Sequence, residues 1–548
     1  MAGGDTGATV LGRPAQRGHL VNGDLCAAVL ALCERLRPGL TPVSAERVAG
    51  VARDLAGPLR LVVAGRIGAG KSTVVNALVG RRVAPTDVRE CTRLVTRFRY
   101  GTVDRVQVVC TDGGRFTLPY DEDGLVPREL GVEPDRIAYL DAFLTSAVLR
   151  SMTVVDTPGL GSLDRTGSAR TEALLGANRS GVAGSDGFDL DAGSRAALAR
   201  AEAVLYVLTE TARAEDVRAL SAFQAMSVPG TGGPANAVAV LNRADQVVVG
   251  PGSAPTAVDP SVDPSADPTA ADPMVPAAAL AATVTTALRR QVCDVLPLAG
   301  LVAEATETGW FSRADADVLR QIAALDPSRR VLLLYSTDLF LRPEVPVPVP
   351  ARTRLLERLG LGGIARAVGL LVARPTLTAG ELCEALVGWS GFPVVRNVVE
   401  GVFGRRGDAI KAGVALAALH AVAAQAPVQA DRMRVRDAVE DLLARPRTHA
   451  LRLFEAASLV ASGTVPLPDD LATELSLLVG SDHAASQLGV PGADPDTVRQ
   501  LALDRAVRWR SFATAGSTPA QSRVAHVVHR GFFLLWQRLA TDPHAGPW

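Results

Sequence analysis

The sequence predicts an α/β fold, in which a domain with a mainly parallel β-sheet is joined to an all-α helical bundle. From residue 59 onward, short apolar runs alternate with helical stretches, which is typical of strands connected by helices. Beyond the proline-rich stretch 343–350 the strand signals fade, and long helical patterns rich in Ala, Leu and Arg follow. At 548 residues the chain is also longer than one compact core supports, so we expect two or three domains.

The N-terminal part is expected to be helical after a disordered start. Residues 1–20 are Gly-rich and contain no continuous apolar core of the signal-peptide kind. Residues 21–56 have apolar side chains at helical spacing, interrupted around Pro38 and Pro42. This pattern predicts a pair of helices.

Residues 57–345 are predicted to form the α/β domain. Its strands are expected at 61–64, 106–110, 153–155, 204–208, 238–241 and 295–298. Two insertions, 177–193 and 250–276, are rich in Gly, Ser, Asp or Pro. Their low apolar content predicts flexible surface loops.

Residues 351–540 are predicted to form a helical neck and trunk. Helical patterns are found at 353–371, 379–389, 408–424, 434–459 and 523–538. So long a helical region implies a bundle or a stalk.

The charge balance argues against a nucleic-acid partner. Lys+Arg and Asp+Glu both number 57, whereas a dedicated nucleic-acid binder carries a basic excess or stripe. Lysine itself occurs only at Lys71 and Lys411, so nearly every positive charge is an arginine.

Cysteine usage and hydropathy predict a cytoplasmic protein. The six cysteines show neither the close pairs of a zinc site nor the density of a disulfide scaffold. The longest Ala/Val/Leu run, 412–424, is too short to cross a bilayer and contains His420. Any membrane contact is therefore expected to be peripheral, on the inner face of the cell membrane.

The segment 65–73 carries the first motif that implies chemistry. Residues 65–72 fit the spacing G-x-x-x-x-G-K-[ST], with an expected strand before them and a helix after them. Such a loop wraps backbone N–H groups around phosphate oxygens, and the helix directs its positive end at them. We expect Lys71 to contact the β- and γ-phosphates as a catalytic cation and Ser72 to bind Mg²⁺. The nucleotide-binding residues expected in this loop are Gly65, Arg66, Ile67, Gly68, Ala69, Gly70, Lys71, Ser72 and Thr73.

The alternative is a chance Gly-rich turn between a strand and a helix. The scarcity of lysine argues against it, because a chain that uses arginine almost everywhere has kept a compact ammonium at Lys71.

Two further motifs follow in the order that a GTPase requires. Asp156 ends an expected strand, where it is predicted to hold Mg²⁺, and Gly159 is predicted to offer its N–H to the γ-phosphate in catalysis. Asn242, Arg243 and Asp245 match the guanine-binding pattern N-K-x-D, with arginine in place of lysine. Asp245 is expected to accept hydrogen bonds from the guanine N1–H and exocyclic amine, which adenine does not present. Either motif alone is also a common turn.

Thr92, about twenty residues beyond Lys71, is the best candidate for the threonine that binds Mg²⁺ and orients the attacking water. Thr86 is a rival, and Thr92 as a plain loop or strand-start residue is the structural alternative.

With these motifs in register, the chain resembles the bacterial dynamin-like GTPases, most closely the isoniazid-inducible dynamin-like proteins of mycobacteria. The resemblance covers about residues 20–515. It is carried by the segments 58–64, 74–80, 84–86, 92–96, 98–101, 156–159, 243–245, 354–360, 390–391 and 396–398.

The resemblance implies a Mg²⁺-dependent GTPase head, of the P-loop class, on a neck and trunk of helices that includes the N-terminal pair. It also implies a homodimer formed through the heads, a paralogous dynamin-like protein as a further partner, and nucleotide-dependent membrane remodelling. One departure stands out, since dynamins usually carry Gln-Ser where this chain has Ile67 and Gly68. Arg66 is then either a catalytic charge supplied in cis or a solvated arginine.

Two segments are candidates for membrane contact, and the sequence does not decide between them. Residues 532–536, flanked by Arg530 and Arg538, have the aromatic and basic mix of an interfacial helix, although burial in the bundle explains them as well. Residues 391–395 fit an exposed apolar loop at a trunk tip.

The expected function is a dynamin-like GTPase that hydrolyses GTP to GDP and phosphate and couples dimerisation to membrane binding. The alternatives are a regulatory switch GTPase that acts on a protein partner without membrane remodelling, and an ATPase.

Overall fold

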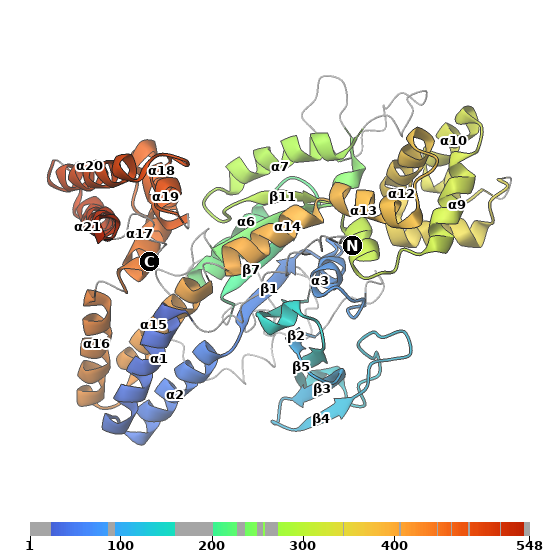
Figure 1. The fold of residues 1–548 in the computed structure, drawn as a ribbon. Helices are drawn as coiled ribbons and strands as arrows, with labels where there is room; N and C mark the ends of the chain where they lie inside the picture. Colours follow the sequence, from blue (N-terminus) through green and yellow to red (C-terminus); the bar gives the residue numbers. More distant parts are fainter. Residues whose placement is uncertain are drawn as a thin grey trace, which may run out of the picture.

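The computed structural model describes residues 23–85, 94–158, 201–226, 236–248, 256–257, 272–342, 345–404, 407–445, 448–461, 463–480, 483–515 and 517–541. Figure 1 shows a central sheet with helical lobes on either side of it.

Within the described residues, the sheet contains nine strands in the order β11-β8-β7-β1-β6-β2-β5-β3-β4. Neighbours from β11 to β6 are parallel, as are β2 and β5, whereas β2 runs antiparallel to β6 and β3 runs antiparallel to β4 and β5. The strands are β1 (Leu59–Gly65), β2 (Thr96–Tyr100), β3 (Arg105–Cys110), β4 (Arg115–Leu118), β5 (Ile137–Leu144), β6 (Met152–Asp156), β7 (Ala203–Leu208), β8 (Ala237–Asn242) and β11 (Val295–Leu298). A separate pair joins β9 (Val247–Val248) and β10 (Thr256–Ala257).

All six predicted strands are present, and the prediction of a mainly parallel sheet is confirmed. Sequence reasoning missed β2, β4 and β5. Thr96–Tyr100 alternates in polarity, and Arg97 on β2 forms a double hydrogen bond at 2.7 Å with Asp141 on β5. A half-polar strand of this kind gives a weaker apolar signal than the buried strand β1.

Helices cover both faces of the sheet. Alternate residues of β1 point to opposite sides, because side chains in a strand have period two. Leu61 and Val63 pack with α3 (Lys71–Val79), α8 (Gly300–Glu307) and α14 (Phe392–Val398). Val62 and Ala64 pack with α6 (Ala214–Met226) and α7 (Met274–Leu288).

The remaining helices form three further groups, each with its own hydrophobic cluster. One group, at the right of Figure 1, contains α9 (Arg313–Ala323), α10 (Pro327–Leu334), α11 (Thr337–Phe340), α12 (Val349–Ala373) and α13 (Ala379–Trp389). The second contains α1 (Asp24–Leu36), α2 (Pro42–Ala56), α15 (Gly407–Gln425) and α16 (Gln429–Ala444). The third contains α17 (His449–Ala461), α18 (Asp469–Gly480), α19 (Ala484–Gln487), α20 (Pro495–Thr514) and α21 (Pro519–Thr541).

The N-terminal helix pair therefore packs with α15 and α16, although several hundred residues separate them in the sequence. The segment 351–540, expected as one bundle, is divided among these groups. The expected helix 434–459 is interrupted, since α16 ends before Arg445 and α17 begins at His449. The cause is Pro446, because the residue before a proline is driven to extended backbone and Arg445 has ψ 141°.

The prediction of a flexible loop over 250–276 is wrong at its C-terminal end, and Thr256–Ala257 within it form β10. Asp272 accepts a hydrogen bond from the indole Nε1 of Trp389, 2.8 Å away, and α7 begins at Met274. The expected insertion 177–193 and the N-terminal residues 1–20 lie outside the described residues.

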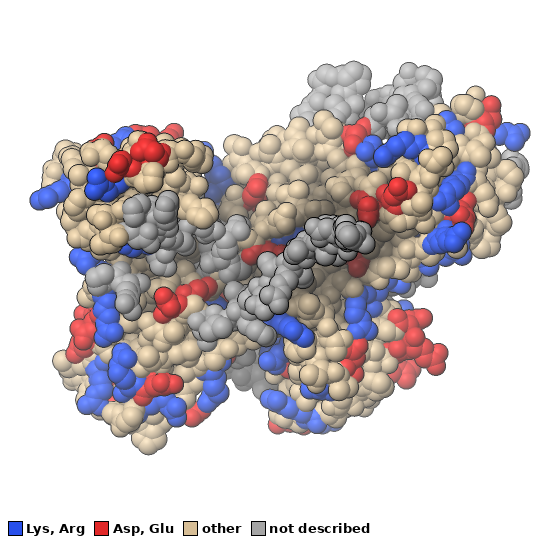
Figure 2. Space-filling view, in the orientation of Figure 1, with Lys and Arg blue, Asp and Glu red and all other residues tan. Residues whose placement is uncertain are grey.

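One described helix, α15, is long and apolar enough to cross a membrane. Its apolar side chains include Ala412, Leu416 and Leu419, which are buried against α1, α2 and α16. This is the pattern of a core helix in a bundle. Figure 2 shows acidic and basic side chains interspersed over the visible face.

Candidate functional site

The predicted phosphate loop joins the buried strand β1 to helix α3 at the carboxyl edge of the sheet. At two positions of this loop, other parts of the protein approach the backbone so closely that only glycine fits. A Cβ on Gly65 would lie 2.5 Å from the carbonyl oxygen of Val207, and a Cβ on Gly70 would lie 2.3 Å from Nδ2 of Asn242. Both have positive φ, 151° and 89°, which side chains rarely adopt.

Lys71 is the first residue of α3 and is nearly buried. Its Nζ donates a hydrogen bond to the carbonyl oxygen of Arg66, 3.0 Å away, so the ammonium lies within the curl of the loop. Backbone N–H groups at the start of α3 have no partner within the helix, which makes this end a favourable site for anions.

Asp156 ends β6 beside this loop, as predicted, and is completely buried. Its Oδ2 accepts a hydrogen bond from the Ser72 hydroxyl, 3.0 Å away. Its Oδ1 has no hydrogen-bond partner among the described residues. Burial raises the pKa of Asp156 to about 6, against the opposing charge of Lys71. A buried carboxylate oxygen without a partner, next to a hydroxyl, is a donor set that fits Mg²⁺.

Asn242, at the end of β8, has both of its polar side-chain atoms engaged by the protein. Nδ2 donates to the carbonyl oxygen of Ala69 at 2.8 Å, and Oδ1 accepts from the backbone N–H groups of Gly300 at 3.0 Å and Arg243 at 2.9 Å. Asn242 thus connects the phosphate loop to the N-terminus of α8.

The next residues bring the predicted guanine motif to the same edge. Arg243 has φ 59°, and its Nη2 donates to the carbonyl oxygen of Gly68, 2.8 Å away. Asp245 follows in a short 3₁₀ turn, and burial raises its pKa to about 6.

Sequence reasoning predicted the helix 353–371, but not its contact with Asp245. Helix α12 is kinked at Gly360, where φ is 66° and ψ is 173°. A Cβ on Gly362 would lie 2.5 Å from the backbone oxygen and 2.8 Å from Oδ2 of Asp245. The close glycines of the segment 360–363 were the available signal, because glycine inside a helix pattern marks a kink or a close backbone approach.

Arg66 is partly exposed to solvent and Ile67 is exposed. Arg66 forms an ion pair with Glu215, with 3.9 Å between Nε and Oε2, and Ile67 is 44% exposed.

Thr92, its rival Thr86, and Gly159 lie outside the described residues, so their predicted roles stay predictions. The base of the loop that leads to Thr92 is described. Asn76 on α3 accepts hydrogen bonds from the backbone N–H groups of Val83 and Ala84, and it donates to Glu304 on α8 at 2.7 Å.

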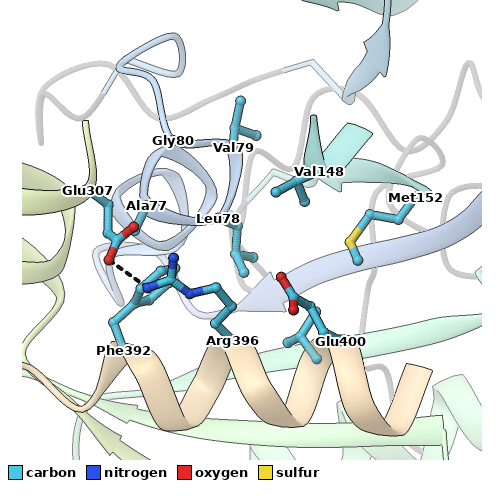
Figure 3. A pocket seen from close by; sticks show the side chains of 11 residues that line it. Ala77, Leu78, Val79, Gly80, Val148, Met152, Glu307, Phe392, Arg396 and Glu400 are labelled. Carbon is cyan, nitrogen blue, oxygen red and sulfur yellow. Dashed lines mark hydrogen bonds and ion pairs between the residues drawn. The ribbon is translucent and has the colours of Figure 1, made fainter. Parts of the chain in front are cut away.

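A small cavity of about 80 Å³ lies behind α3 (Figure 3). Arg396 crosses it from α14, forms an ion pair with Glu307 at 2.8 Å and stacks on Phe392. The cavity is lined by the C-terminal part of α3 and by no residue of the phosphate loop, so it is separate from the candidate nucleotide site.

Comparison with known proteins agrees with this geometry. The sequence profile of the Dynamin family matches residues 61–233. The isoniazid-induced protein IniC of Mycobacterium tuberculosis is 33% identical over 466 residues, which cover 84% of this chain and 86% of that protein. The chain belongs to the bacterial dynamin-like GTPases. The predicted family, fold class and GTPase activity are thereby confirmed.

Two other similarities of this dynamin-like protein are more limited. A bacterial dynamin-like protein of Nostoc punctiforme is 32% identical over 133 residues, covering 22% of this chain and 19% of that protein. A solved structure described as an oligomerised bacterial dynamin pair, with a mechanism for long-range sensing and tethering of membranes, aligns with 95% of this chain and 74% of its own at 11% identity. Its TM-score is 0.28, too low to define a shared arrangement.

Proposed function

We propose that this protein hydrolyses GTP at the edge of the sheet where Lys71, Ser72, Asp156 and Asp245 meet, and that it couples the nucleotide cycle to head-to-head dimerisation and peripheral membrane binding. The observation that carries the site is Asp156, whose unpartnered Oδ1 is buried beside Ser72 and the phosphate loop. A buried carboxylate oxygen without a hydrogen-bond partner is costly, which supports a cation bound at this position.

Each residue of the site would have a separate role in binding the phosphates, the Mg²⁺ ion or the base. Lys71 and the backbone N–H groups of the loop would stabilise negative charge on the β- and γ-phosphates. Ser72 and Asp156 would hold Mg²⁺, which when bound neutralises phosphate charge. Asp245 would read the guanine edge. Asn242 is a positioning residue, because its amide is already committed to Ala69 and Gly300.

Two contacts support coupling between the head and the helical parts. Gly300, the first residue of α8, donates its N–H to Asn242, and α8 packs against α12 and α13. Lys411 on α15 donates from Nζ to the carbonyl oxygen of Gly57, 2.6 Å away, at the junction between α2 and β1.

The replacement Lys71→Ala tests the site. We expect phosphate release from GTP to fall to background while the thermal unfolding midpoint stays close to that of the wild type. Undiminished hydrolysis would remove the assignment. The matched control is Arg66→Ala in the same loop, which should keep most of the turnover because Arg66 faces Glu215. A large loss in this control would instead make Arg66 the catalytic charge.

Dimerisation and membrane binding are tested separately. Sedimentation velocity with a non-hydrolysable GTP analogue should show a dimer that is absent with GDP. Vesicle sedimentation should show lipid binding, and turnover indifferent to lipid together with no sedimentation would favour a switch that acts on a protein partner.

A further inference from the structure

Helix α21 has a charge that differs from that of the whole chain. Its residues, Pro519–Thr541, include Arg523, Arg530, Arg538, His526 and His529 and no Asp or Glu. The complete chain, by contrast, has equal numbers of acidic and basic residues. In Figure 1, α20 and α21 lie at one end of the molecule, apart from the sheet.

One face of α21 is fully used for packing. Val528, Phe532 and Leu535 are buried in the cluster that α17, α18 and α20 share. Of the predicted interfacial segment 532–536, therefore, Phe532 and Leu535 serve the core. The rest of that segment is at or near the surface.

The opposite face of α21 combines arginine with aromatic side chains. Arg523, His526, Arg530 and Phe533 recur at helical spacing and are all exposed. The ring of Phe533, 36% exposed, lies 5.4 Å from the ring of Trp536 and 6.3 Å from that of His529. The rings of His529, Phe533 and Trp536 thus form a continuous aromatic row on α21, the helix that also carries Arg530.

The arginines of this face lack carboxylate partners among the described residues, unlike the arginines of the neighbouring helix. On α20, Arg505 and Arg508 form ion pairs with Glu474 of α18. The exposed face of α21 therefore carries net positive charge.

We propose that the exposed face of α21, formed by Arg523, His526, Arg530 and Phe533 with the half-buried Trp536 at its edge, docks on an anionic lipid bilayer. Arginines bind lipid phosphates, while Phe and Trp rings insert at the level of the headgroups. The inference deepens the proposed function and rests on its membrane component. Single-stranded nucleic acid fits this face less well, since the Phe533 ring already packs against two neighbouring rings and offers less surface for base stacking.

The second candidate segment, 391–395, does not fit a membrane tip. Phe392 and Val395 are buried in the core of the head, and a Cβ on Gly391 would lie 2.3 Å from the carbonyl oxygen of Pro297.

The test uses the full chain and sedimentation with vesicles of phosphatidylcholine alone or mixed with phosphatidylglycerol. We expect the wild type to bind only the anionic vesicles, and less tightly at high salt. The double replacement Arg523→Glu with Arg530→Glu should weaken binding by about twenty-fivefold or more, at about fivefold for each basic residue lost near the surface. Phe533→Ser should weaken it without changing the salt dependence.

The matched control is Arg115→Glu with Arg313→Glu, which changes the net charge equally at two exposed arginines without ion pairs among the described residues. It should bind within about twofold of the wild type. Basal GTP turnover and circular dichroism should be unchanged in every variant, and Arg523→Gln with Arg530→Gln provides a milder replacement if charge reversal disturbs folding.

Three results would overturn the proposal. If the α21 double variant and the control double variant both bound anionic vesicles as tightly as the wild type does, α21 would be excluded as the docking surface. The proposed function would stay intact. Absence of wild-type binding to any vesicle would remove both this surface and the membrane component of the proposed function. If the wild type bound single-stranded RNA more tightly than vesicles, and the α21 variants lost this binding, the face would be assigned to nucleic acid.

Discussion

The side-chain amide of Asn242 donates a hydrogen bond to the carbonyl oxygen of Ala69, 2.8 Å away. Since the other atom of that amide accepts from Gly300, one side chain holds the phosphate loop, strand β8 and helix α8 together. These segments are distant in the sequence and meet at the carboxyl edge of the sheet.

Replacement of Asn242 by Ala should therefore reduce both stability and nucleotide binding. Buried N–H and C=O groups at Ala69 and Gly300 would lose their partner, at a cost of about 1–3 kcal/mol in the free energy of unfolding. Urea denaturation and fluorescent GTP binding measure the two effects. Asn242→Asp separates the bonds, because it keeps the acceptor for Gly300 and loses the donor to Ala69. Wild-type stability in both variants would contradict this role.

Asp245→Asn should change the base that is preferred. An amide presents an N–H where the carboxylate accepted one, so GTP affinity should fall about tenfold or more and xanthosine triphosphate should bind better. Competition between the two nucleotides for the purified protein gives the ratio. An unchanged preference for GTP would assign base selection to another residue.

Gly362→Ala should weaken GTP binding although residue 362 lies outside the nucleotide motifs. The added methyl would overlap the backbone and carboxylate of Asp245, which must then shift. We expect a loss in affinity of about tenfold, about 1.4 kcal/mol, measured by titration calorimetry. Gly388→Ala is the control, because a Cβ there meets nothing within 4 Å. Equal effects in the two variants would indicate a general helix effect.

Glu304 should make stability depend on pH. Burial raises its pKa to about 7 in the folded protein, against an ordinary value of 4.5. Between these two pKa values, the folded state holds a proton on Glu304 that the unfolded state has released. The stability that Glu304 contributes is therefore fully present below pH 4.5 and is lost as pH rises from about 4.5 to about 7. The expected change is on the order of 3 kcal/mol at most.

Glu304→Gln should remove this part of the pH dependence while keeping an acceptor for Asn76. Denaturant midpoints between pH 5 and pH 8, compared for the two proteins, measure it. Parallel curves for wild type and variant would show that Glu304 does not titrate in this range.

Local pattern was sufficient for much of the fold. Buried strands such as β1 and β7 show continuous apolar runs, and α13 and α21 show helical periodicity, because these signals depend on residues a few positions apart. Strand β2 escaped detection because its arginines are balanced by Asp141 on another strand, which no local window contains.

The sequence by itself determined the α/β head, the helical C-terminal half and the family, and it named the candidate residues of the site. Glycine spacing, a rare lysine and carboxylates at strand ends are properties of short segments. The tertiary structure alone decided which polar atoms have hydrogen-bond partners within the protein and which side chains are buried. In the folded protein, Asn242 donates a hydrogen bond to Ala69, and Gly362 lies against Asp245. Phe532 is buried, whereas its neighbour Phe533 is exposed. Such relationships depend on packing between segments that are remote in the chain, where burial and distance, and not residue type, decide what a side chain can do.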